Sequence, residues 1–180
     1  MSEYEELIRK CQKKSSKAFD ELYKKYSPLV YGICLRYTKN RNDAQDLLQE
    51  CFIKIMDRIV DFRFEGSFEG WLRRLTVNEA LNFIRLNSKS FEEYCDDSDI
   101  SMASYDPDSL SSLSAQELLK YINALPDGYR TIFNLYVIEG YPHTEIAKML
   151  NIAEATSRSQ LKKAREFLIE LINKKDFGNE

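Results

Sequence analysis

Apolar residues recur along this chain at three- and four-residue intervals, the period that predicts amphipathic helices. Such stripes cover residues 4–11, 19–26, 30–37, 47–59 and 71–84, so we expect the first half to be a helical bundle. We expect Pro28 to begin one of these helices, and residues 38–42 to form a polar break before the next. No segment alternates convincingly with the period of two that predicts a strand. The predicted fold class is therefore all-α.

The stripes stop at residues 88–114, which are rich in Ser and Asp and contain Pro107. The net charge of the whole chain is −3. Residues 91–110 hold seven acidic residues and no Lys or Arg, so the rest of the chain carries +4. Such a composition predicts a flexible acidic linker. We therefore predict two small helical domains, residues 1–87 and 115–180, joined by a linker at 88–114.

Residues 142–165 contain two short helical patterns separated by a tight turn at Asn151. The second pattern places Leu161, Ala164 and Leu168 on an inward face. Arg158, Lys162 and Arg165 recur on its opposite side. This arrangement is typical of a helix-turn-helix whose second helix enters a DNA major groove. His143 precedes these residues, and we expect it to be an ordinary helix-surface residue.

An acidic face marks the expected helix at residues 43–59, where Asp43 is expected to cap the N-terminus. Asp43, Asp46, Gln49 and Glu50 lie together on its outer side. Such a face is most simply solvated, with acid placed favourably near a helix N-terminus. It could also dock a basic partner helix. A metal site is the third reading, although no histidine or second acidic cluster stands at matching spacing.

Three phenylalanines are crowded into the loop at residues 61–70, which also contains Gly66 and Gly70. Aromatic rings in such a loop can stack on unpaired bases, or they can cover the end of the helical bundle. The helix expected at 71–87 places Arg73, Arg74, Asn78, Asn82 and Arg85 on its exposed side. Basic and amide side chains there fit contact with a nucleic acid.

The remaining composition excludes several function classes. The only histidine is His143, and Cys11, Cys34, Cys51 and Cys95 lack the spacing of a metal site or disulfide framework. We expect reduced, mostly buried thiols, no metal and no cofactor. The common phosphate-binding and hydrolase motifs are absent. No apolar run is long enough for membrane insertion, and the first residues lack a signal-peptide core, so we expect a cytoplasmic protein.

Taken in order, the motifs DAQDLLQECF, WLRRLTVN and LPDGYRTIFNLYVIEGYPHTEIAKMLNIAEATSRSQLKKAR resemble a bacterial RNA polymerase sigma factor of the extracytoplasmic-function (ECF) subfamily. The resemblance covers almost the whole chain. It implies sigma region 2 in the first domain and region 4 in the second. It also implies a subunit without catalytic activity, which directs core RNA polymerase to promoters and initiates transcription. The resemblance further implies an anti-sigma factor as a partner, and it implies that the free protein is a monomer.

The resemblance also implies residue roles. Docking on the polymerase β′ coiled coil falls on Asp43, Asp46, Leu47, Gln49, Glu50 and Phe52. A second polymerase contact, to the β flap, is implied without assigned residues. Capture of a flipped base of the −10 element, with adjacent phosphate contacts or strand separation, falls on Phe62, Phe64, Ser67, Phe68, Arg73, Arg74 and Asn78. Reading of the −35 element falls on Thr156, Arg158, Ser159, Lys162 and Arg165.

The residues leave three alternatives to a sigma factor open. A stand-alone helix-turn-helix regulator would bind DNA without polymerase and would need a dimer interface. A carboxylate-dependent nuclease would use Asp43, Asp46 and Glu50 with a metal ion. A sigma-like adaptor would bind polymerase without starting transcription.

Overall fold

The computed structural model describes residues 3–87 and 113–176. Within these two ranges every regular element is a helix and none is a strand, which confirms the predicted all-α class. The chain divides into two compact units, residues 1–83 and 84–180, and each is described by itself. Residues 88–112 of the predicted linker lie outside the described residues. No helix in the described ranges is both long and apolar enough to cross a bilayer.

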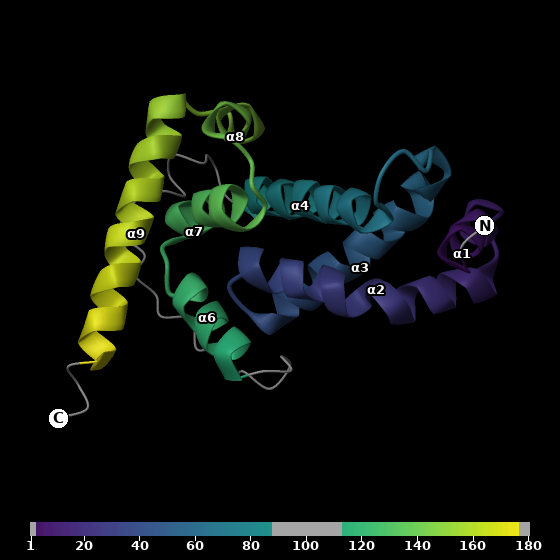
Figure 1. The fold of residues 1–180 in the computed structure, drawn as a ribbon, viewed down its shortest axis with the longest axis horizontal. Helices are drawn as coiled ribbons and strands as arrows, with labels where there is room; N and C mark the ends of the chain where they lie inside the picture. Colours follow the sequence, from purple (N-terminus) through teal and green to yellow (C-terminus); the bar gives the residue numbers. More distant parts are fainter. Residues whose placement is uncertain (1–2, 88–112, 177–180) are drawn as a thin grey trace. The chain divides into compact units, whose positions relative to one another are not determined.

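The N-terminal unit is built around a long helix, α2, with α3 packed along it (Figure 1). A short helix α1 contacts α2, and a single 3-10 turn, η1, continues from α3. Its elements are α1 (Glu3–Gln12), α2 (Ser16–Tyr37), α3 (Arg41–Arg58), η1 (Ile59–Asp61) and α4 (Phe68–Asn87), whose last four residues extend past the unit boundary.

Pro28 lies inside α2, so the expectation that it begins a helix is wrong. Buried residues continue at four-residue spacing through it, with Leu22 and Tyr26 on one side and Val30 on the other. A proline within a helix costs about 3 kcal/mol. Full burial of an aliphatic side chain returns about 1.5–3 kcal/mol. Packing on both sides of Pro28 therefore outweighs the local preference for a break.

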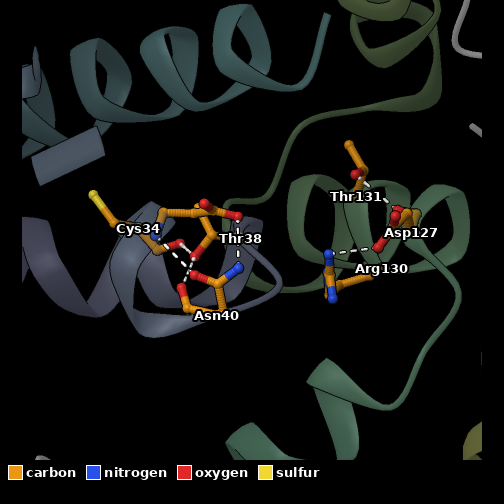
Figure 2. A network of polar contacts seen from close by, with 7 residues as sticks. Cys34, Thr38, Asn40, Asp127, Arg130 and Thr131 are labelled. Carbon is orange, nitrogen blue, oxygen red and sulfur yellow. Dashed lines mark hydrogen bonds and ion pairs between the residues drawn. The ribbon is translucent and has the colours of Figure 1, made fainter. Parts of the chain in front are cut away.

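The junction between α2 and α3 is closed by side-chain caps (Figure 2). Thr38 Oγ1 donates to the Cys34 carbonyl at 3.0 Å, beyond the end of α2. Asn40 Oδ1 accepts from the Asp43 N–H at 2.9 Å, and Asn40 Nδ2 donates to Asp43 Oδ2 at 2.9 Å. The cap of α3 is therefore Asn40 and not Asp43 as expected. This reciprocal pairing resembles a capping box, and it starts the helix at Arg41.

The thiols of the N-terminal unit are free and buried, as predicted for Cys11, Cys34 and Cys51. Burial raises the pKa of Cys11 to about 11. A hydrogen bond with Cys34, together with burial, raises the pKa of Cys51. Neutral, buried thiols of this kind serve as small apolar side chains. Cys95 lies outside the described residues.

The C-terminal unit packs its last helix, α9, against α6, α7 and α8. Its core includes Leu125, Tyr129 and Ala164, with Phe133, Phe167 and Leu168 packed around them. The elements are α6 (Leu113–Asn123), α7 (Asp127–Phe133), the π-helical turn η2 (Asn134–Ile138), α8 (His143–Leu150) and α9 (Glu154–Asp176).

Polar pairs hold the start of α7. Arg130 is almost fully buried, and its Nη2 donates to Asp127 Oδ1 at 2.6 Å (Figure 2). Thr131 Oγ1 donates to the Asp127 carbonyl at 2.9 Å. After α7 the chain widens into η2, where the Glu139 N–H reaches the Asn134 carbonyl at 2.9 Å. This wider turn contains one more residue than an α-helical turn, and we attribute the exposure of Tyr136 to it.

Candidate nucleic-acid and polymerase interfaces

A buried aromatic cluster holds the loop between η1 and α4 in place. Phe68 is fully buried, with Tyr26 and Phe62 edge-on at 5.4 and 5.2 Å between ring centroids. The Trp71 ring stacks on Phe68 at 5.4 Å. The Phe68 N–H donates to Tyr4 Oη at 2.8 Å. The start of α4 is therefore anchored to α1 and α2.

The three phenylalanines of this loop do not play equal parts. Phe62 and Phe68 are buried, so neither ring offers a free face to a base in this structure. They match the alternative in which loop aromatics cover the end of the bundle. Phe64 is half-buried, in the left-handed backbone region at φ 60°, with the Arg9 guanidinium 4.6 Å from its ring centroid. Phe64 is thus the phenylalanine of this loop with exposed aromatic surface.

Two adjoining surface hollows lie beside this loop, of about 320 and 410 Å³. Asp61, Trp71 and Arg74 line both of them. Asn78 lines the first, and Ser67 the second. A half-buried indole can stack on a base, an exposed guanidinium can contact phosphate, and an amide can pair with a base edge. Of the seven predicted −10 residues, Phe62, Ser67, Arg74 and Asn78 therefore line one or both hollows. Phe64, Phe68 and Arg73 line neither, and Arg73 is exposed on α4.

Four of the six predicted polymerase-binding residues reach the surface on the acidic side of α3. Asp46, Gln49 and Glu50 are exposed, and Asp43 is half-buried. Leu47 and Phe52 instead point inward and are buried; the Phe52 ring lies 4.5 Å from that of Tyr23. These two residues can support the face from behind, but their side chains do not form its free surface.

Three apolar residues that the sequence interpretation missed extend the same face. Ile53, Met56 and Val60 are 60%, 50% and 51% exposed. At 100° per residue, they fall on the same side of the α3–η1 segment as Asp46 and Gln49. The available signal was their spacing at i, i+3 and i+7 outside the inward row of the helix. An apolar stripe continuing an acidic one is typical of a protein-binding surface.

The helix-turn-helix forms as predicted. Asn151 takes the left-handed conformation, φ 55° and ψ 47°, and ends α8. Along α9, Ser157, Leu161 and Ala164 are buried, whereas Arg158, Ser159, Lys162 and Arg165 are exposed and Thr156 is half-buried. Glu154 Oε1 accepts from Arg158 Nε at 3.2 Å and also from Nη2. Lys162 lies 3.8 Å from Glu166. Four of the five predicted −35 residues are therefore exposed along α9, and Thr156 lies half-buried at one edge of that surface.

The expectation that His143 is a helix-surface residue is wrong. Its side chain is 8% exposed, and its Nδ1 lies 2.9 Å from Ser157 Oγ. The Tyr136 ring stacks on it at 4.3 Å. Burial lowers the pKa of His143, the cations Arg158 and Arg165 lower it further, and Glu154 raises it. Apolar periodicity does not assign a polar residue to the inside, because it contains no information on buried polar pairs.

The family comparisons match both units in order. Residues 22–90 match Sigma-70 region 2, and residues 115–168 match Sigma-70 region 4. The ECF RNA polymerase sigma-E factor of Haemophilus influenzae is 32% identical over 90% of this chain and 91% of its own length. The ECF RNA polymerase sigma factor SigM of Bacillus subtilis is 30% identical over 86% of this chain and 95% of its own.

A solved structure shares the fold. The sigma factor RpoE of Bartonella quintana, crystallised in complex with the anti-sigma factor NepR, aligns with a TM-score of 0.56. That alignment covers 87% of this chain and 98% of that chain at 22% identity. The sequence relatives carry the assignment to a family, and the structural likeness agrees with it in fold. The chain belongs to the ECF subfamily of RNA polymerase sigma factors.

Proposed function

We propose that this ECF sigma factor initiates transcription by holding core RNA polymerase with one side of α3 while its two units read the two promoter elements. On α3, Asp46, Gln49 and Glu50 meet basic groups of the β′ coiled coil, with Asp43 at the edge. Ile53 and Met56 extend that contact with apolar area. This division is supported by their exposure along one side of the helix.

The −10 element is opened at the hollows beside α4. A base leaves the duplex stack and lies against Phe64 and Trp71, which offsets an unstacking cost of a few kcal/mol. Asn78 and Ser67 contact the edge of that base, and Arg73 and Arg74 bind phosphates of the separated strand. Phe62 and Phe68 hold the loop from below. The observation that carries this proposal is the convergence of Trp71, Arg74 and Asn78 on one hollow.

The −35 element is read by the outer side of α9. Arg158, Lys162 and Arg165 supply cations to guanine acceptors and phosphates, while Thr156 and Ser159 supply hydroxyls. Because both elements are bound by one chain, their affinities combine through effective concentration. A second contact of this unit to the β flap fixes it on the polymerase.

Outside the transcription complex, we propose a monomer in the cytoplasm, held inactive by an anti-sigma factor. The Bartonella relative was crystallised with such a partner. The protein has no reaction of its own in this proposal, because polymerase supplies all of the chemistry.

Run-off transcription with core polymerase on a genomic promoter pool tests the proposal. We expect new transcripts only when the protein is added, from promoters sharing two sequence elements. A 2-aminopurine base placed in the −10 element should gain fluorescence as it unstacks. Transcripts that do not depend on the protein would overturn the proposal. DNA binding without polymerase and without transcripts would instead indicate a stand-alone regulator.

A further inference from the structure

A buried polar pair joins the two helices of the helix-turn-helix. Ser157 is 0% exposed and His143 8%, and their side chains meet at 2.9 Å between Oγ and Nδ1. Ser157 stands in the inward row of α9, which continues with the apolar residues Leu161 and Ala164. A hydroxyl in that row needs a partner, because an unpaired buried polar group costs more than the bond contributes.

The imidazole is held on more than one side. Tyr136, from η2, stacks on it with centroids 4.3 Å apart and ring planes 20° apart. His143 is itself the first residue of α8, and its edge faces Ser157 of α9. The ring therefore ties three successive elements together. Either tautomer can make the bond: Nδ1 accepts from the serine hydroxyl, or Nδ1–H donates to its oxygen.

Because of the position of Ser157, this bond can affect the orientation of the DNA-reading face. Its sequence neighbours are Thr156 and Arg158, and the exposed Ser159 follows. Side chains of a helix reach roughly 6 Å from its axis, so a 20° rotation of α9 moves their ends by roughly 2 Å. A recognition site must be held within about 0.5 Å and 10–20° of its productive geometry. Apolar contacts at Leu161 and Ala164 are not directional, whereas a hydrogen bond is.

We infer that the His143–Ser157 hydrogen bond fixes the rotation of α9 about its axis and thereby determines which −35 bases Arg158 and its neighbours prefer. His143 and Ser157 are positioning residues in this view, and neither touches DNA. The inference rests on the proposed function, in which α9 reads the −35 element. It adds a determinant of base preference that lies behind the reading face.

Two variants of equal shape isolate the hydroxyl. Ser157→Thr and Ser157→Val add the same methyl group to a buried site, but only the threonine variant keeps a hydroxyl for His143. Each is assembled into holoenzyme and tested by run-off transcription on a pool with a randomised −35 element. We expect Ser157→Val to change relative preferences at the bases nearest Arg158 by roughly two- to tenfold, the range that a single hydrogen bond spans. Ser157→Thr should keep the wild-type ranking.

Relative preference within one pool does not depend on how much of the sample is folded. An equal ranking for the valine, threonine and wild-type chains would overturn the inference. So would an equal change in both variants, because the shared methyl group would then be the cause. Failure of the proposed function looks different, since the wild-type chain itself would show no −35 preference for any variant to alter.

A second pair decides the matter if Ser157→Val does not fold. His143→Asn and His143→Leu have similar shapes, but only the asparagine variant keeps a polar group near Ser157. We expect the leucine variant alone to change the −35 ranking. Identical rankings for the two variants would contradict the inference.

The single histidine allows a direct check in the free protein. Labelling with ¹⁵N-histidine gives imidazole resonances from this site only. We expect Ser157→Val to shift the Nδ1 resonance and Ser157→Thr to leave it near the wild-type position. An Nδ1 resonance unmoved by the valine variant would show that the bond is not formed in solution, and the inference would fail.

Discussion

The two units of this sigma factor hold their functional surfaces in different ways. The N-terminal unit fixes its loop with buried rings, and the buried polar side chains described there are Thr38 and Thr76. In the C-terminal unit, buried polar side chains lie throughout the described core, from Asn123 and Arg130 to His143 and Ser157. One unit is therefore held mainly by apolar packing, and the other also by directional polar contacts.

The difference corresponds to the task proposed for each unit. A trapped base needs rigid surfaces around it, and close-packed rings such as Phe68 and Trp71 supply them. Such packing requires the rings to fill the space, but it does not require them to meet at one defined angle. Direct readout of a duplex needs helix side chains at defined angles, which hydrogen bonds restrict better than apolar contacts. Polar pairs such as His143–Ser157 therefore belong where orientation matters most.

The largest expected effect comes from removing a ring of the buried aromatic cluster in the N-terminal unit. Phe68→Ala deletes a fully buried ring and should destabilise that unit by about 3–5 kcal/mol. Trp71 is the only tryptophan, so its fluorescence during urea unfolding reports this unit alone. The histidine resonances should show the C-terminal unit still folded. Simultaneous loss of both signals would mean that the two units are not independently stabilised.

Phe64→Ala is the matched control for that variant. It removes a ring from the same loop, but a half-buried one, so the stability of the unit should change by less than about 1.5 kcal/mol. The 2-aminopurine signal of −10 opening should fall nevertheless. Normal opening of the −10 element by Phe64→Ala would show that Phe64 is not part of the base-trapping site.

The next effect tests the docking face. Asp46→Arg reverses an exposed charge on α3, and like charges across an interface cost several kcal/mol. We expect binding to core polymerase to weaken by about 3 kcal/mol, more than a hundredfold, with unfolding unchanged. Asp20→Arg, an exposed acid on α2, provides the charge-matched control. Equal binding by the two variants would indicate that the acidic face of α3 is merely solvated.

Sequence periodicity predicted the helices of the N-terminal unit and the helix-turn-helix of the C-terminal unit, because their inward rows are largely apolar. The helix-turn-helix, the turn at Asn151 and the exposed side of α9 all follow from that pattern. The continuous α2 did not follow, because local preference favours a break at Pro28 and only tertiary burial of Leu22, Tyr26 and Val30 overrides it.

The site residues divide in the same way. Charged residues such as Asp46 and Arg158 were placed on the correct faces, because charge predicts exposure well. Aromatic and polar residues were placed less well: Phe62, which the resemblance assigned to the −10 site, is buried, and His143, the expected surface residue, is inside. Their positions depend on which neighbour meets each ring or polar atom, and that information is not local to the sequence. Residues 88–112 of the predicted linker lie outside this comparison.

A smaller effect is expected at the reading face of the C-terminal unit. Arg158→Ala removes a cation proposed to contact a base, which should weaken −35 binding by about 1–3 kcal/mol and relax preference at one position. Lys120→Ala is a control with the same loss of charge, because Lys120 is exposed on α6, outside the helix-turn-helix. Equal base preferences in these two variants would contradict the assignment of the outer side of α9.

The smallest expected effect is a pH dependence of stability that the C-terminal unit has and the N-terminal unit lacks. The pKa of His143 is lowered in the folded state, chiefly by burial, from about 6.5 in an unfolded chain. Above that pH, both states are neutral at this residue and it contributes no pH dependence. As the pH falls below about 6.5, the unfolded chain binds a proton that the folded chain does not, so the C-terminal unit loses stability until the lower, folded pKa is passed.

This contribution of His143 to the pH dependence of stability should be present in the C-terminal unit only. The single histidine lies in the C-terminal unit, so hydrogen exchange of amides in α8 and α9 should reveal a loss of protection that amides of α2 do not share. His143→Asn, which does not titrate in this range, should remove the difference between the wild-type profiles of the two units. A loss that persisted in the asparagine variant would have to come from carboxylates, and the polar core around His143 would then not be what distinguishes the C-terminal unit.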